Sequence, residues 1–296
     1  MLMKTSFAIE RTTDGISLRR SKVEKLLGVN FLEGLCSADK TSPENYSSMR
    51  SRKFYNDNII KPLVKSGKIG DGTSDKFDDR KLRFHSAIIN KGILEIRTGI
   101  SYYQAHKEIV KNTKTENERL KARGLNFLED EYAFFERPIA VAAALITNEG
   151  CVFLGERANV STYVGSLSLA AGYISYTDEL NTINPEKEAR REVEEEIGVI
   201  ERDIISMKFV GLYTNPDSGV VDFTYLAPIR MSNKELLSAW EKAKDKEHSR
   251  KIQIPDYSAL QHLLKTGSLK KTDKKFNLMH SARGALQSIR LGEIND

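Results

Sequence analysis

The sequence predicts an α/β protein in which a smaller α+β part, residues 1–135, precedes a sandwich of a mixed sheet between helices, residues 136–296. After Pro138, short apolar runs of strand length alternate with longer segments of helical periodicity, which is the pattern of a layered α/β fold. The chain has 296 residues, 40% of them hydrophobic and 29% charged, so it can bury a substantial core as a globular protein.

The first part mixes short strands with helices. Strands are expected over 5–11 and 16–19 around the turn Asp14-Gly15, and over 82–88 and 92–100 around a turn at 90–92. Helices are expected over 21–27, over 53–70 with a break at Pro62, and over 101–123 with an end at Gly124; the segments 37–52 and 70–79 read as polar loops.

The second part begins with the nearly continuous apolar run PIAVAAALIT, residues 138–147, followed by a partner strand over 151–157 and a further extended segment over 166–174. An antiparallel pair is expected over 204–214 and 219–229. Three helices are expected to complete the fold, over 233–244, 256–264 and 277–291, with a loop between the first two.

Charge is unevenly distributed along the chain. The net charge is +5, and residues 1–136 carry 25 basic and 19 acidic side chains, so this part attracts phosphate-bearing partners, RNA included. A solvated basic surface explains the same balance, and the lysines expected on the helix 101–123 fit it equally well: Lys107, Lys111, Lys114 and Lys121. No apolar run approaches the length of a membrane span, and the N-terminus lacks a signal-peptide core. Two cysteines, Cys36 and Cys151, do not make a disulfide framework, so a cytoplasmic setting is expected.

The segment from Gly172 to Val199 contains the most informative helix. Asn184 is a plausible N-cap, Pro185 suits the first helical position, and Gly198 supplies a left-handed end. At about 100° per residue, four glutamates share one arc beside an apolar stripe. The arc is Glu188, Glu192, Glu195 and Glu196, and the stripe is Ala189, Val193 and Ile197.

This arc favours a hard metal ion. Four carboxylates on one face repel one another unless some protonate or a cation joins them, and no lysine is interspersed on that face. Mg²⁺ is bound through a few carboxylates together with substrate phosphates. An acidic surface helix is the alternative, and Arg190 and Glu194 are expected to form a solvated pair on the opposite side.

Residues 191–199, REVEEEIGV, resemble the core of the Nudix box, R-E-U-x-E-E-x-G-U with U aliphatic, at every specified position. The resemblance implies an α/β/α sandwich that hydrolyses nucleoside diphosphate derivatives with Mg²⁺ or Mn²⁺. It implies that Glu192, Glu195 and Glu196 are metal ligands, that the Gly172 carbonyl helps, and that Arg191 orients a glutamate.

The loop between Gly172 and this core departs from the box. The box has a glutamate six residues after its glycine and eight before its arginine, whereas those positions here are Asp178 and Ile183, because the loop carries a five-residue insertion. Asp178 and Glu179 are the candidates for the missing glutamate. The glycine pair that usually opens the loop is Ala171-Gly172.

Other residues with relevant chemistry lie outside the box. Arg157 ends a strand and could clamp a diphosphate, with a surface salt bridge as the alternative. Asp217 and Asp222 flank a strand start that could supply a base, although a turn and a polar strand position explain them equally. Three aromatic residues could stack a base or pack in the core: Tyr163, Tyr173 and Tyr176. The five histidines show no metal-ligand spacing and are expected to be structural or exposed.

Three functions remain open. The segment Gly99–Tyr103, the strand PIAVAAALIT and FLGERANV resemble the layout of the UDP-glucose and UDP-galactose pyrophosphatase branch of Nudix hydrolases, which implies a small nucleotide sugar as substrate. Glu195, or a carboxylate outside the box, would then take the proton of the attacking water. An RNA 5′-end or cap hydrolase is the second reading, which the basic N-terminal part favours. A non-catalytic Nudix-fold regulator is the third, which Ile183 favours and the intact core opposes.

Overall fold

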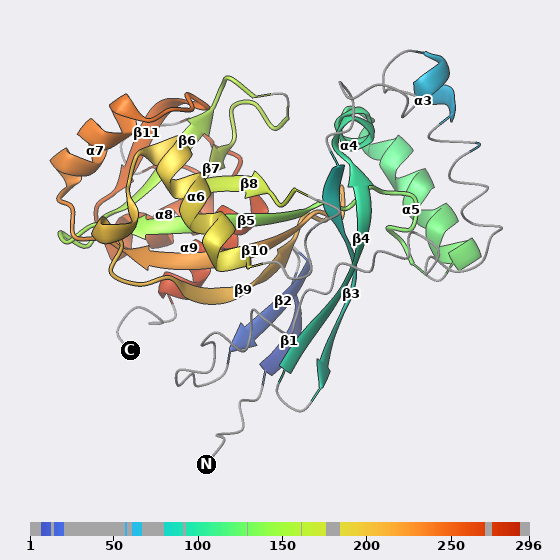
Figure 1. Ribbon diagram of the computed structural model, residues 1–296, viewed down its shortest axis with the longest axis horizontal. Coiled ribbons are helices and arrows are strands. Elements are labelled where there is room, and N and C mark those ends of the chain that lie inside the picture. The colour runs from blue at the N-terminus through green and yellow to red at the C-terminus, as the bar shows by residue number, and fades with distance from the viewer. Residues whose placement is uncertain are drawn as a thin grey trace.

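The computed structural model describes residues 7–12, 15–20, 57, 61–66, 80–90, 93–128, 130–160, 162–175, 184–269 and 274–290. Its centre is a mixed sheet in the order β11-β6-β5-β10-β9, with β7 paired to β6 and β8 paired to β5 (Figure 1). This arrangement of a mixed sheet between helices confirms the fold class expected for the second part of the chain.

Strand β5, Ile139–Ile146, is buried along its whole length because helices cover both faces of the sheet. It runs parallel to β10, Val221–Pro228, and antiparallel to β8, Ala170–Tyr173. Strand β10 pairs in turn with β9, Lys208–Thr214, which confirms the predicted antiparallel pair.

Successive residues of β5 point to opposite faces, and each face has its own core. On one face, Val141 and Ala143 pack with helices α6, Pro185–Ile197, and α7, Asn233–Lys242. The other face packs against α8, Tyr257–Thr266, and α9, His280–Arg290; Figure 1 shows α6 in front of the sheet and α9 behind it.

Two expectations for the sheet were wrong. Strand β6, Val152–Arg157, pairs with β5 only between Ile146 and Val152, and its principal neighbour is β11, His248–Ile254, in a segment expected to be loop. The β11 sequence HSRKIQI hides its strand character, because an edge strand with partly exposed faces carries charged side chains and loses apolar alternation. Strand β7, Leu167–Ser168, lies on the other side of β6.

The earlier part of the chain contains two hairpins. Strands β1, Phe7–Thr12, and β2, Gly15–Arg20, pair antiparallel, as do β3, Arg80–Asn90, and β4, Ile93–Tyr102, which confirms both predicted strand pairs. Within the expected helix 53–70, α3 spans Lys61–Lys65 with Pro62 in its first turn. The helix expected over 21–27 and the loops over 37–52 and 70–79 lie outside the described residues.

The helix expected over 101–123 is two helices. Helix α4 spans Tyr103–Val110 and α5 spans Lys114–Leu128, and between them the Thr113 hydroxyl and backbone N–H both bond to Glu116 at 2.7 and 2.6 Å. This Thr-x-x-Glu pairing caps α5 and starts a new helix. Gly124 does not end the second helix, since it lies inside α5, where an added Cβ would meet the Asp130 carbonyl oxygen at 2.4 Å.

The β3–β4 hairpin joins the edge of the central sheet. The Leu82 N–H donates to the Ile174 carbonyl at 2.9 Å, and Phe84 donates to Arg137 at the same distance. The Leu82 side chain is fully buried in the core that contains Ile139. The described part of the chain holds no helix that is long and apolar enough to cross a bilayer. The boundary near residue 135 stays a prediction.

Candidate functional site

Helix α6 is built as its sequence predicts. The Asn184 side chain accepts a hydrogen bond from the Lys187 N–H at 2.9 Å, Pro185 begins the helix, and Gly198 ends it with φ +79°. Ala189, Val193 and Ile197 are buried against the sheet. This seating orients the adjoining glutamate arc toward β8 and the open end of the sheet.

The glutamates of the arc lie against β8 at very short range. A Cβ added to Gly172 would lie 2.1 Å from Glu192 Oε1, so only a glycine allows this carboxylate to sit there. The Ala171 N–H donates to Glu196 Oε2 at 3.3 Å. The sequence Ala171-Gly172 therefore positions two of the carboxylates, one through a hydrogen bond and one through the absence of a side chain.

Arg191 contacts three members of the arc. Its guanidinium bonds to Glu188 at 3.1 Å, to Glu195 at 2.5 Å and to Glu192. Lys244 Nζ lies 3.3 Å from Glu195 as well. The expectation that no cation reaches this face was therefore wrong, because arginine is long enough to reach carboxylates one, three and four residues away. Arg190 does not pair with Glu194 as expected; it bonds to Glu186 at 2.6 Å and to Glu201 at 2.9 Å.

Burial disfavours the charged form of two glutamates. The pKa of Glu196 is raised well above its ordinary value, chiefly by burial and then by the nearby charges of Glu247 and Glu192. The pKa of Glu192 is also raised by burial, although Arg191 opposes the shift. Carboxylates in such a position gain when a cation binds between them and the ligand.

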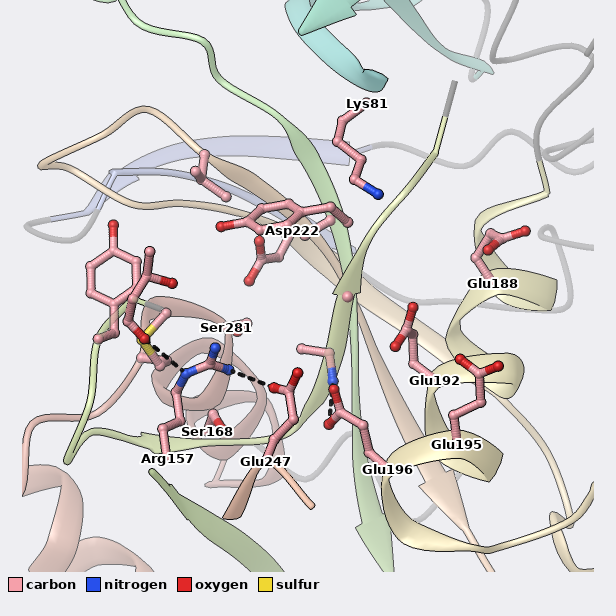
Figure 2. A pocket seen from close by; sticks show the side chains of 18 of the residues that line it. Lys81, Arg157, Ser168, Glu188, Glu192, Glu195, Glu196, Asp222, Glu247 and Ser281 are labelled. Atoms are coloured by element: carbon pink, nitrogen blue, oxygen red, sulfur yellow. Dashed lines mark hydrogen bonds and ion pairs between the residues drawn. The ribbon is translucent and has the colours of Figure 1, made fainter. Parts of the chain in front are cut away.

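The arc forms one wall of a cavity of 650 Å³. Figure 2 shows the glutamates of α6 on one side, Arg157 and Glu247 below, Asp222 near the centre and Lys81 entering from above. The cavity brings together every predicted site residue of the box and the three proposed for substrate binding, which are Arg157, Tyr173 and Asp222. Tyr163 also lines it, whereas Asp217 does not; the Asp217 N–H bonds to the Asn215 side chain in a turn. Asp178, Glu179, Ile183 and Tyr176 lie outside the described residues.

Arg157 stands at the end of β6 and faces Glu247, which precedes β11. Its guanidinium lies 3.8 Å from Glu247 Oε2 and donates to the Thr162 carbonyl at 3.4 Å. Burial raises the pKa of Glu247, while Arg157 lowers it. Glu247 was not predicted from the sequence, because it lies in the charged run KDKEH, which reads as an ordinary polar loop.

Tyr173 is fixed from behind by residues of α4. Its hydroxyl lies 3.1 Å from His106 Nε2, and its ring lies 5.5 Å from that of Tyr103. His106 is buried, which lowers its pKa to about 3, so it is neutral at physiological pH. The imidazole therefore serves as an uncharged support for Tyr173.

Asp222 and His280 form a second contact that the sequence did not reveal. His280 Nε2 lies 3.0 Å from Asp222 Oδ2, within ion-pair distance but without hydrogen-bond geometry, and both residues line the cavity. Asp222 Oδ1 has no hydrogen-bond partner among the described residues. The two residues are 58 positions apart in the chain, and neither belongs to a motif that could have paired them in advance.

The donor chemistry of the arc suits a hard divalent cation, because all its groups are carboxylate oxygens. Gly172 and Glu192 are in contact, and Glu196 is held by the neighbouring Ala171 N–H. Among the described residues, no three acidic, histidine or cysteine side chains already converge on one point as a metal cluster. Arg191 draws the carboxylates toward itself, so metal binding at this face requires some of them to turn away from the guanidinium.

No family model and no curated protein matches this sequence. Among solved structures, the chain is similar to the NUDIX domain of Shewanella oneidensis NrtR complexed with ADP ribose, with 18% identity over 58% of this chain and 98% of that one, and a TM-score of 0.34. The M. Smegmatis Nudix hydrolase RenU gives 14% identity over 53% and 86% of the two chains, with a TM-score of 0.32. A NUDIX hydrolase from Nitrosomonas europaea gives 16%, 52%, 89% and 0.34 in the same order. These likenesses are partial and concern about half of this chain.

Proposed function

We propose that this protein is a Nudix-type hydrolase that cleaves the diphosphate linkage of a nucleoside diphosphate derivative, with a nucleotide sugar as the favoured substrate. The observation that supports it most is the glutamate arc of α6 packed against Gly172 at the wall of a cavity large enough for such a ligand. The box resemblance of residues 191–199 names the reaction, and the cavity supplies the place for it.

Glu192, Glu195 and Glu196, with the Gly172 carbonyl, would hold Mg²⁺ or Mn²⁺. When bound, the ion neutralises the diphosphate and lowers the pKa of a coordinated water. Arg191 keeps the carboxylates of the arc oriented through its bonds to Glu188 and Glu195.

The remaining groups bind the substrate and move the proton. Arg157, at the other side of the cavity, can bind phosphate oxygens through its planar guanidinium if it leaves Glu247. A water oxygen forms a bond to one phosphorus as the P–O bond of the anhydride breaks, and the proton of the water passes to a Glu195 carboxylate oxygen. The products are a nucleoside monophosphate and a phosphorylated remnant such as a sugar 1-phosphate.

The lysines that favoured an RNA substrate are mostly accounted for locally. Lys111 pairs with Glu108 at 2.6 Å, Lys114 lies 3.9 Å from Glu118, and Lys107 lies beside the Tyr103 ring. These are the contacts of a solvated helix surface, so a small ligand remains the favoured substrate.

A substrate panel tests the proposal directly. Purified protein with Mg²⁺ or Mn²⁺ is incubated with UDP-glucose, UDP-galactose, ADP-ribose and 5′-triphosphorylated or capped RNA, and the products are identified by mass spectrometry. A nucleoside monophosphate with a sugar phosphate is expected, and the Glu195→Gln variant should lose it. Turnover of RNA alone would replace the favoured substrate with an RNA end, and ligand binding without turnover of any compound would indicate a regulator.

A further inference from the structure

The cavity receives side chains from the part of the chain that precedes the sandwich. Lys81 of β3 and Tyr103 of α4 both line it, opposite residues of β6 and beside those of β8. Figure 2 shows the Lys81 side chain reaching down into the cavity with its ammonium group foremost.

The backbone around Lys81 is held firmly to the sandwich. Lys81 forms a bridge with Ser175, and the next residue, Leu82, donates to the Ile174 carbonyl at 2.9 Å. The Arg83 guanidinium is buried and donates to the Phe135 carbonyl at 2.7 Å. Three successive residues are thus fixed to the edge of the sheet, and this fixes the point from which the Lys81 side chain extends.

The charge of the cavity explains why a lysine is useful there. Its described lining contains more carboxylates than basic side chains: Glu188, Glu192, Glu195, Glu196, Asp222 and Glu247 against Lys81, Arg157 and Arg191. The two arginines are in contact with carboxylates of the same cavity, at 3.8 Å for Arg157 and 2.5 Å for Arg191. Lys81 Nζ instead donates to the neutral Ser175 hydroxyl at 3.1 Å and lies 6.0 Å from the centre of the Tyr103 ring.

We infer that Lys81 is an anion-binding residue of the substrate site, and that it binds a phosphoryl group of the ligand from the side opposite Arg157. This inference rests on the proposed function for the nature of the ligand. An ammonium group on a flexible stem suits a phosphoryl oxygen, because it acts as a point charge and can follow the ligand. The segment before the sandwich would then complete the substrate site.

Isothermal calorimetry with two probes, ADP and inorganic pyrophosphate, tests this on the full-length protein, with Mg²⁺ and with chelator. Lys81→Gln removes the charge but keeps a donor for Ser175, so we expect both probes to bind about tenfold more weakly or worse. Lys81→Arg should restore most of the affinity. Lys107→Gln is the matched control, because Lys107 lies 5.7 Å from the same Tyr103 ring but does not line the cavity; its affinities should stay unchanged.

The outcomes separate this inference from the proposed function. Equal affinities of Lys81→Gln and the wild type for both probes would overturn the inference, as would a loss for ADP alone, which would place Lys81 at the sugar or base. Equal losses in Lys81→Gln and Lys107→Gln would also overturn it, since both lysines would then act only through Tyr103. Lys81-dependent binding of pyrophosphate without hydrolysis of any nucleotide would support the inference and contradict the hydrolase.

Discussion

Replacing Gly172 by alanine puts a methyl group where the Glu192 carboxylate now lies. The added Cβ would be 2.1 Å from Oε1 and 2.2 Å from Cδ of Glu192, whereas non-bonded heavy atoms such as these settle at about 3.5 Å. The carboxylate must therefore move by more than about 1 Å. It can do so without moving α6 or β8, since it is the end of a flexible side chain.

The expected consequence is a loss of activity with little loss of stability. A misplacement of about 1 Å can reduce a rate about 100-fold. The backbone at Gly172 is outside the left-handed region, so alanine adds no conformational strain, and the free energy of unfolding should change by less than about 1 kcal/mol. We expect kcat/KM for the best substrate of the panel to fall about 100-fold, with weaker binding of Mn²⁺ by calorimetry.

Gly150→Ala is the control with the opposite signature. Gly150 has φ +77° and no atom within 4 Å of an added Cβ, so alanine there is strained but touches nothing. It should cost about 1 kcal/mol of stability and leave kcat/KM unchanged. Full activity and undiminished metal affinity in Gly172→Ala would refute the role assigned to this close contact.

Three further predictions concern metal and pH. The double variant Glu195→Gln, Glu196→Gln should bind Mg²⁺ and Mn²⁺ at least about tenfold more weakly by calorimetry; unchanged affinity would exclude these side chains as ligands. Metal should raise the midpoint of thermal unfolding relative to chelator, because it binds the native state alone, and superimposable melts at saturating metal would contradict a preformed site. Glu136 is buried with its carboxylate accepting from the Tyr102 N–H at 2.6 Å, and burial raises its pKa to about 8. Its contribution to stability is therefore complete below about pH 4.5 and is lost as the pH rises toward 8, by up to roughly 5 kcal/mol. Glu136→Gln should flatten the decline in stability between pH 6 and 9 in urea titrations, whereas the exposed Glu131→Gln should leave it in place.

Local signals predicted helix α6 almost completely. Its N-cap, its first-turn proline, its terminal glycine and its buried stripe all follow from the spacing of residues within one short segment. The close contact between Gly172 and Glu192 also agrees with the box resemblance, which places these two residues in one site. Such features depend on neighbours in the sequence, and for this reason the sequence reveals them.

The features that the sequence did not reveal depend on contacts between distant segments. Glu247 enters the cavity because β11 pairs with β6, and Lys81 enters because β3 joins the sheet beside β8. His280 meets Asp222 because α9 packs across the sheet from β10. Each of these residues sits in a segment whose composition suits solvent, and only tertiary pairing brings it inside.

The docking of β3 also protects the sheet from other chains. A strand edge with unpaired N–H and C=O groups is a template for association with a second molecule. The hydrogen bond from Leu82 to Ile174 occupies this edge just beyond β8, and the Leu82 side chain fills the core beneath it. A fragment starting near residue 136 would expose both the edge and the apolar seat of Leu82. The leading segment therefore acts as a cover that keeps the sandwich monodisperse, and its removal would favour aggregation before any effect on catalysis could be measured.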